Sequence, residues 1–86
     1  MKSLIKNYID KLDINKLKEF ANKNEIELSN EELKYIYSLI KNNIDDILID
    51  ENPYLKNLKE NINNTSYQKI EDLTKFYKAK YKGYLF

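Results

Sequence analysis

The stretch LSNEELKYIYSLIKNNI, residues 28–44, decides the fold, because it carries both a helix start and a long apolar face. Ser29 followed three residues later by Glu32 is a capping box, and Leu28 and Leu33 occupy the positions of a hydrophobic staple. Large apolar side chains then recur every three or four residues. The pattern predicts an amphipathic helix that begins after Ser29 and buries one face.

The residues before this stretch predict two shorter helices. An apolar stripe that ends at Leu12 indicates a first helix beginning near Ser3. Asp13 is expected to cap a second helix, with Leu12 and Leu17 forming its hydrophobic staple. Residues 22–28, NKNEIEL, then break the helical pattern and predict an extended connector.

Two further helices are predicted after residue 44. Asn42 and Asn43 suit a helix end, since Asn tolerates the left-handed backbone conformation. Pro53 is expected to open the fourth helix, with Asn52 as its cap. Residues 61–66 predict a loop, and Thr65 with Gln68 predicts a capping box for a fifth helix. The expected apolar stripe of this last helix is Ile70, Leu73, Tyr77, Tyr81 and Tyr84.

Short amphipathic segments of this kind are marginally stable alone and must bury their stripes against one another. The chain is therefore expected to be all-α, a compact bundle or orthogonal array of four to five short amphipathic helices. One glycine and one proline leave little turn chemistry for a multi-stranded sheet. The 86 residues are expected to form a single helical domain, residues 1–86.

Several function classes are disfavoured by what the chain lacks. Without His, Cys or Arg, there is no Ser-His or Cys-His machinery, no His-containing zinc site and no Arg-assisted phosphoryl transfer. The acidic residues of segment 45–51 enclose Ile47–Ile49 and no glycine, so they do not form an EF-hand loop. We expect no enzyme, no cofactor and no metal site. Without an apolar signal region or a membrane-spanning run, a cytoplasmic protein is expected.

The segment KFYKAKYKGYLF, residues 75–86, mixes aromatic and basic side chains and leaves two interpretations open. Aromatic rings that stack on bases beside lysines that follow phosphates are typical of single-strand nucleic-acid binders, and an aromatic-basic helix is equally suited to rest on an anionic membrane. Alternatively, Tyr77, Tyr81 and Tyr84 continue the buried stripe, and the lysines are solvated at the helix end. The candidate interaction surface is Lys75, Lys78, Lys82, Tyr84, Leu85 and Phe86.

Three segments carry a resemblance to a known family. They are KLDINKLKEFANKNEIELSNEELKYI at residues 11–36, IKNNIDDI at residues 40–47 and LKNLKENI at residues 55–62. In order and spacing the chain resembles the YqfT-like family of short proteins of low-GC Gram-positive bacteria. The resemblance implies a small helical fold, and it supplies no activity, ligand or site residue.

Large side chains exceed what five apolar stripes need, notably Tyr35, Leu39, Ile47–Ile49, Tyr54 and the pair Leu85 and Phe86. A small monomer cannot bury all of them, and apolar surface left exposed often marks a partner site. The leading hypothesis is therefore a regulatory or protein-interaction module that binds a protein partner or itself. The alternative is a nucleic-acid-binding protein that uses the basic-aromatic C-terminal helix, although the net charge is only +1.

Overall fold

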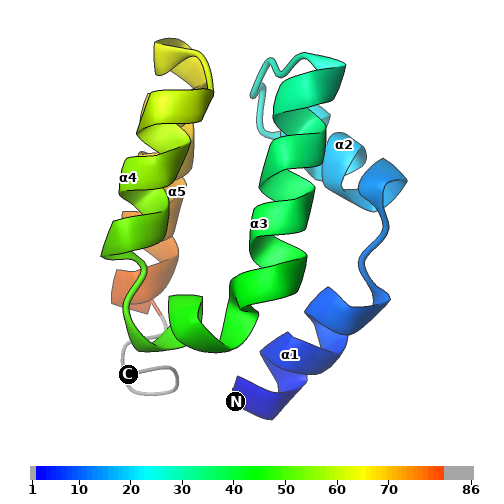
Figure 1. Cartoon of the computed structure of the whole chain (residues 1–86), viewed down its shortest axis with the longest axis vertical. Coiled ribbons are helices and arrows are strands. Elements are labelled where there is room, and N and C mark those ends of the chain that lie inside the picture. Colours follow the sequence, from blue (N-terminus) through cyan, green and yellow to red (C-terminus); the bar gives the residue numbers. More distant parts are fainter. Residues whose placement is uncertain (1, 81–86) are drawn as a thin grey trace.

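The stretch that decides the fold forms the central helix of the structure, α3 (Asn30–Ile49) (Figure 1). The structure is a computed structural model that describes residues 2–80, with side chains from Ile5 onward. Ser29 Oγ accepts the backbone N–H of Glu32 at 3.1 Å, and Glu32 Oε1 accepts that of Ser29 at 2.9 Å. The predicted capping box is confirmed, and Leu33 and Ile36 on the apolar face are buried.

Helices α1 (Lys2–Lys11) and α2 (Ile14–Lys23) both pack against α3. Asp13 caps α2 as predicted, because its carboxylate accepts the backbone N–H of Lys16 at 2.8 Å. Lys41 of α3 donates to the carbonyls of Ile9 and Asp10 at 2.9 and 2.8 Å. The cation thus satisfies carbonyls at the C-terminal end of α1, where the helix dipole favours positive charge.

The end of α2 is a Schellman motif built on a non-glycine residue. Glu25 has φ of 58°, the left-handed region, and is the one non-glycine residue with positive φ among residues 2–80. Its N–H donates to the carbonyl of Asn22 at 3.1 Å, and the N–H of Ile26 donates to that of Ala21 at 2.8 Å. The buried side chains of Ile26 and Ala21 complete the motif and turn the connector toward α3.

The predicted helix end at Asn42 and Asn43 is a kink inside α3. Asn43 leaves the helical region with φ of −131° and ψ of 16°, and its side-chain amide donates to the carbonyl of Leu39 at 2.9 Å. The helix resumes directly and continues to Ile49 in a new direction. The asparagine therefore breaks the helix locally, as its chemistry predicts, without ending it.

The last two helices are α4 (Asn52–Asn61) and α5 (Asn64–Lys80). Helix α4 begins one residue earlier than predicted, with Glu51 rather than Asn52 at the cap position. The predicted Thr65–Gln68 capping box is wrong, since α5 already begins at Asn64. Asn63 stands before it, and its side-chain oxygen accepts the N–H of Ser66 at 2.9 Å.

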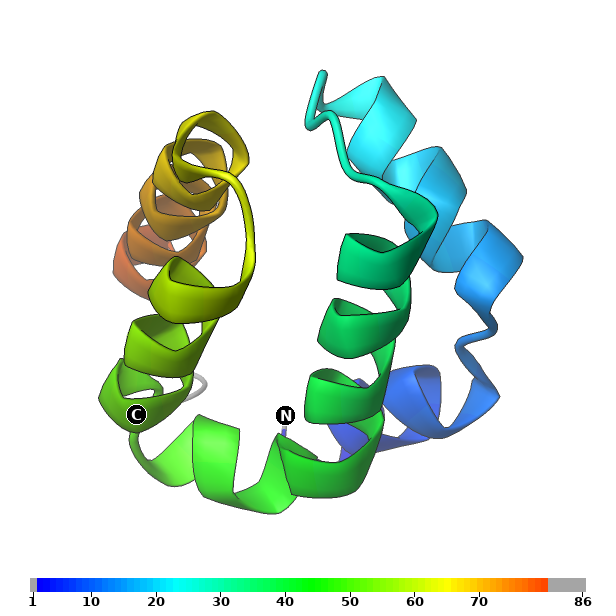
Figure 2. The same ribbon diagram turned by 45° about the horizontal axis from the view of Figure 1, so that its top comes forward.

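The predicted all-α fold is confirmed for the described part of the chain, residues 2–80, which contains five helices and no strand. Helix α3 packs on α4, and α4 packs on α5. Figure 2 shows α1, α2 and α3 on one side and α4 with α5 on the other, joined by the part of α3 that follows Asn43. The buried residues of the common core are Leu17, Leu33, Ile36, Leu58, Ile62 and Tyr67.

Candidate interaction surface

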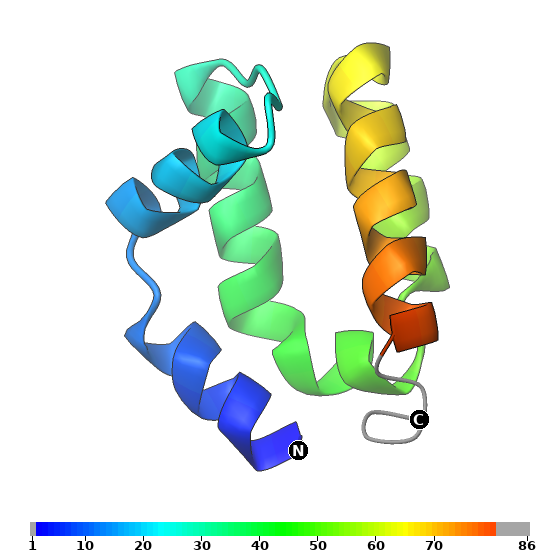
Figure 3. The same ribbon diagram turned by 180° about the vertical axis from the view of Figure 1, so that it is seen from behind.

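Three adjoining apolar hollows lie along α3, and we call them together the α3 groove. Ile40 lines all three hollows, and Ile36 and Ile70 line two of them. Figure 3 looks onto this side of the molecule, where α2 and α5 stand on either side of α3. The hollows have volumes of about 170, 100 and 190 Å³.

Each hollow is bounded by a different set of helices. The first, between α3, α4 and α5, is lined among others by Ile47, Tyr54, Leu55 and Thr74. The second, between α2, α3 and α5, is lined among others by Leu17, Phe20, Ala21 and Ile26. The third, between α1, α2 and α3, is lined among others by Tyr8, Ile9 and Leu12. The three hollows share lining residues and therefore adjoin one another along α3.

The groove exists because the apolar stripe of each helix is wider than the strip of surface that neighbouring helices cover. Ile36 and Ile40 are one helical turn apart and project from the same face of α3. Ile36 is buried, whereas Ile40 and Ile70 are only half-buried. The aromatic rings of Tyr8 and Phe20 stand at the far end with 61% and 40% of their surface exposed. Exposed apolar surface between helices is a feature of many interaction sites.

The end of the groove nearest α4 carries polar groups at its rim. Lys78 of α5 donates to Glu51 Oε1 at 2.7 Å, and this contact holds the pKa of the Glu51 carboxyl below its usual value. Desolvation raises the pKa of the Tyr54 hydroxyl, and the nearby charge of Asp46 raises it further. The hydroxyl of Thr74 donates to the carbonyl of Ile70 at 2.9 Å. The interior of this hollow is therefore apolar, and its charges lie at the edge.

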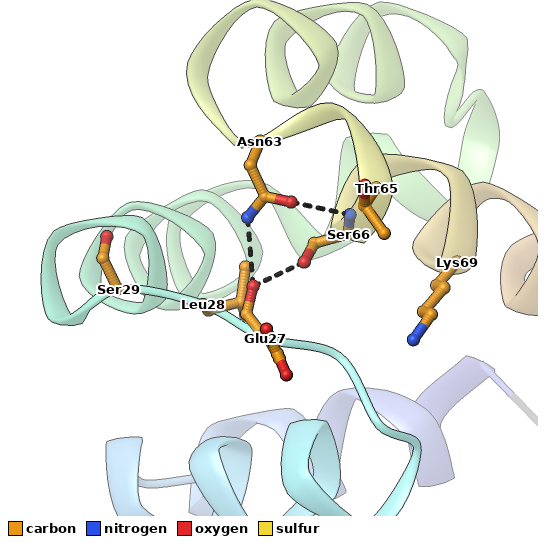
Figure 4. A pocket seen from close by; sticks show the side chains of 7 residues that line it. All are labelled: Glu27, Leu28, Ser29, Asn63, Thr65, Ser66 and Lys69. Atoms are coloured by element: carbon orange, nitrogen blue, oxygen red, sulfur yellow. Dashed lines mark hydrogen bonds between the residues drawn. The ribbon is translucent and has the colours of Figure 1, made fainter.

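A larger and polar hollow of about 440 Å³ lies where the α2–α3 connector meets the start of α5 (Figure 4). The carbonyl of Glu27 accepts Ser66 Oγ at 2.5 Å and Asn63 Nδ2 at 3.0 Å. Lys69 Nζ donates to the carbonyl of Glu25 at 2.5 Å. Asn63, Ser66 and Lys69 all donate to backbone carbonyls of the connector. The hollow is therefore the place where the connector is held to the start of α5, and we call it the joint.

That joint includes a carboxylate shared by two helix starts. Glu32 Oε2 accepts the N–H of Asn63 at 2.5 Å while Glu32 Oε1 accepts that of Ser29. The backbone N–H of Ser29 contributes most to lowering the pKa of the Glu32 carboxyl. The contact joins the start of α5 to the start of α3.

The lysines of the predicted interaction surface are paired with acidic side chains where the structure describes them. Lys75 lies 3.4 Å from Glu71, one turn earlier on α5, and Lys78 lies against Glu51. The remaining predicted surface residues, Lys82, Tyr84, Leu85 and Phe86, lie outside the described residues. The described part of the predicted surface is thus a local set of ion pairs at the C-terminal half of α5.

Of the two interpretations left open for the C-terminal segment, the one in which Tyr77 continues the buried stripe is wrong. Its side chain is 40% exposed and makes an edge-to-face contact with Phe76, whose ring centroid is 5.4 Å away. The physical reason is helix length, since the 17 residues of α5 extend about 25 Å and the 10 of α4 only about 15 Å. The last turns of α5 therefore run past the end of α4. Tyr81 and Tyr84 of the same predicted stripe lie outside the described residues.

The composition and helix lengths of residues 2–80 bear on two further possibilities, a metal site and a membrane span. No cluster of three or more acidic side chains within this range is arranged to hold a metal ion, and this range has no His or Cys. None of the helices there has the length and apolar character needed to cross a membrane. Comparison of the chain with protein-family models, with curated proteins and with solved structures finds no match.

Sequence reasoning identified some groove residues without predicting the groove. Leu39, Ile47 and Tyr54 were singled out as apolar side chains in excess of the stripes, and all three line the first hollow. Ile36 and Ile40 belong to the apolar face predicted for the helix after Ser29, and Ile70 to the stripe predicted for the last helix. Ile36 is buried, but Ile40 and Ile70 are only half-buried. The sequence signal for the groove is the excess of large apolar side chains, because short helices cannot cover all of one another's wide apolar faces.

Proposed function

We propose that this protein is a non-catalytic interaction module that holds an apolar segment of a partner protein in the α3 groove. The observation that carries the proposal is that three apolar hollows adjoin one another along α3 and share Ile40. An amphipathic helix laid into a groove between helices is a common mode of protein recognition. The exposed rings of Tyr8 and Phe20 supply the rigid aromatic contacts that such interfaces favour.

A non-catalytic role agrees with the chemistry of the described residues. The carboxylates with lowered pKa values, Glu32, Glu51 and Glu71, are each held by hydrogen bonds within the fold. In the polar hollow, the side chains of Asn63, Ser66 and Lys69 donate to backbone carbonyls. The α3 groove is lined mainly by aliphatic and aromatic groups. These groups favour the binding of an apolar segment.

Nucleic-acid binding is a second candidate, favoured by one observation on α5. Phe76 is 59% exposed, and the ammonium of Lys80 lies 5.9 Å from the centroid of its ring. A base could stack on such a ring beside a cation. The ion pairs of Lys75 and Lys78 weigh against this candidate, since a phosphate would have to displace Glu71 and Glu51.

Affinity capture with two matched variants tests the proposal. The full chain, Ile47→Gln and Ile49→Gln are used as baits in lysate of the cell that encodes the protein, at high salt, with and without nuclease. Ile47 lines the groove, whereas Ile49 is on the same helix, 73% exposed and outside the groove. We expect proteins that the full chain and Ile49→Gln retain and Ile47→Gln loses, whether or not nuclease is added. Equal retention by Ile47→Gln would reject the groove, and nuclease-sensitive retention would favour nucleic acid.

A further inference from the structure

The third hollow of the α3 groove carries the two most exposed side chains of its lining, the aromatic rings of Tyr8 on α1 and Phe20 on α2. Figure 3 shows α1 and α2 following one another along the same side of α3. The rest of the lining of this hollow, of about 190 Å³, is aliphatic. A partner side chain that fills the hollow therefore meets aliphatic groups inside it and aromatic rings at its edge.

The charged residues that share a helical face with these two rings are all lysines. Side chains three or four positions apart lie on the same face of a helix. Lys11 follows Tyr8 by three positions, Lys16 precedes Phe20 by four, and Lys23 follows Phe20 by three. No acidic residue occupies any of the other positions at these spacings. We call these three lysines the lysine rim.

The lysine rim is exposed and has no carboxylate partner among residues 2–80. Charges near the first hollow, in contrast, are matched within the fold. Asp45 pairs with Lys6 at 3.3 Å, Glu51 pairs with Lys78 at 2.7 Å, and Asp46 lies against a tyrosine hydroxyl of α4. Positive charge that is free to meet a partner therefore lies beside the third hollow.

The acidic residues nearest the lysine rim are turned away from the groove or occupied. The carboxylate of Asp13 caps α2, where it accepts a backbone N–H at 2.8 Å. Asp10 and Glu19 are two positions and one position from the nearest ring, which places them at least about 100° around their helices. Glu27 of the connector lines the polar hollow and none of the three apolar ones. These groups leave the positive charge beside the two rings in place.

The chemistry of the third hollow favours an apolar side chain over a nucleic-acid base. Apart from the hydroxyl of Tyr8, its lining has no polar side-chain group. A base inserted there would leave its polar ring atoms without hydrogen-bond partners, which is costly, whereas a leucine or phenylalanine side chain has none to satisfy. The hollow and the lysine rim together therefore fit a segment that is apolar on one face and acidic beside it.

We propose that the partner segment held in the α3 groove is an acidic amphipathic helix, with its apolar face in the hollows and its carboxylates at the lysine rim. Apolar burial holds such a helix in the groove, and the charges select it over neutral or basic helices. Because the rim lies at one end of the groove, carboxylates near one end of the helix also orient it. The inference rests on the proposed function, since it names the class of partner for the same groove.

Peptide titrations test the inference. Three helical peptides have the same leucine face and differ only at the positions that flank it, which are glutamate, glutamine or lysine. All three should shift the methyl signals of Ile9 and Ile40, which line the third hollow. At low salt the glutamate peptide is expected to bind at least about tenfold more tightly than the lysine peptide. This difference should shrink at about 0.5 M salt, where exposed charges are screened.

Two double variants with the same change of net charge locate the effect. Lys16→Gln with Lys23→Gln should weaken binding of the glutamate peptide at least about fivefold and change that of the glutamine peptide by less than about twofold. The control is Lys18→Gln with Lys34→Gln, at exposed lysines that line none of the three hollows. It should change both affinities by less than about twofold. Unchanged methyl signals of the buried Ile62 without peptide establish that each variant is folded.

Three results would overturn the inference. Equal affinities of the glutamate and lysine peptides, or equal losses in the two double variants, would remove the selection by charge and leave the groove intact. Displacement of the glutamate peptide by oligothymidine, with shifts at Ile9 and Ile40, would assign the hollow and its lysines to nucleic acid. If no peptide shifts these methyl signals, the proposed function fails together with the inference, so the two failures are distinguishable.

Discussion

Glu32 accepts the backbone N–H of Asn63 at 2.5 Å, across 31 positions of sequence, with the same carboxylate that closes the capping box of α3. Asn63 in turn donates from its side-chain amide to the carbonyl of Glu27 at 3.0 Å. The start of α5 is thereby fixed to the start of α3 and to the connector before it. We infer that this joint maintains one end of the α3 groove, because α5 forms one of its walls.

Substitution of Glu32 should separate its two roles. Glutamine preserves the capping box but lacks the charge and the second acceptor oxygen, so Glu32→Gln is expected to lower the free energy of unfolding by about 1 kcal/mol. Glu32→Ala removes both contacts and should lower it by about 2 kcal/mol. Thermal unfolding checks this, with Tm falling by roughly 4–8 °C per kcal/mol in a domain of this size. Glu31→Ala, at an exposed neighbour, should change Tm by much less, and equal losses at both positions would contradict the joint.

Acid should destabilise the protein through the same carboxylate. Hydrogen bonds, chiefly from the N–H of Ser29, hold the pKa of Glu32 below its unfolded value of about 4.3. A depressed pKa in the folded state means that the stabilisation is present above the unfolded pKa and disappears as the pH falls through the folded one. Glu51 and Glu71, also with lowered pKa values, act in the same direction. Urea unfolding between pH 6 and pH 3 should show falling stability below about pH 4.5, with a shallower fall in Glu32→Gln. A pH-independent free energy of unfolding would contradict the assignment.

Glycine at position 25 should stabilise the protein. Glu25 adopts φ of 58° at the end of α2, where a side chain is disfavoured and glycine is not. Glu25→Gly is expected to raise the free energy of unfolding by about 0.5–1 kcal/mol, measured by urea unfolding. Glu27→Gly, two residues along the same connector and without positive φ, should give no gain. A loss of stability in Glu25→Gly would contradict the Schellman geometry.

Binding of single-stranded nucleic acid should be weak. Lys75 and Lys78 face Glu71 and Glu51, so a phosphate would have to displace a carboxylate from each of these two lysines of the predicted surface. Fluorescence anisotropy with a labelled oligothymidine at near-physiological salt is expected to give a Kd above about 100 µM. A Kd in the low micromolar range that weakens steeply with salt, and is lost in Lys75→Gln with Lys78→Gln, would instead support nucleic-acid binding.

Local features of the fold were predictable because their determinants are close in sequence. The capping box of Ser29 and Glu32 and the cap at Asp13 each depend on residues within one helical turn, and both predictions are confirmed. The predicted start of α5 was wrong because Asn63, Thr65 and Ser66 all have side chains that can cap a helix. The contacts of Asn63 with Glu27 and Glu32 determine that Asn63 is the residue that does so. Those contacts join segments more than 30 residues apart, which local sequence patterns do not encode.

The candidate site was less predictable than the fold. The excess of apolar residues pointed to Leu39, Ile47 and Tyr54, but which of them meet depends on how α3 bends at Asn43. The exposure of Tyr77 was missed because periodicity gives the face of a helix and not the length of its neighbour. The groove is a property of how five stripes fit together, so it became visible only with the helices in place.

A titration with a defined amphipathic peptide tests the central claim, that the α3 groove binds an apolar helix. The probe is a 14-residue helical peptide of leucine and lysine, and the control is a scrambled peptide of the same composition. On the full chain labelled at isoleucine methyl groups, the account predicts saturable shifts at Ile36, Ile40, Ile47 and Ile70 with little change at the exposed Ile49. Ile47→Gln should weaken binding at least about fivefold, and Ile49→Gln should not. Three results would contradict the claim: shifts centred on Ile49, equal affinity of the full chain for the scrambled peptide, or equal affinity of Ile47→Gln for the helical peptide.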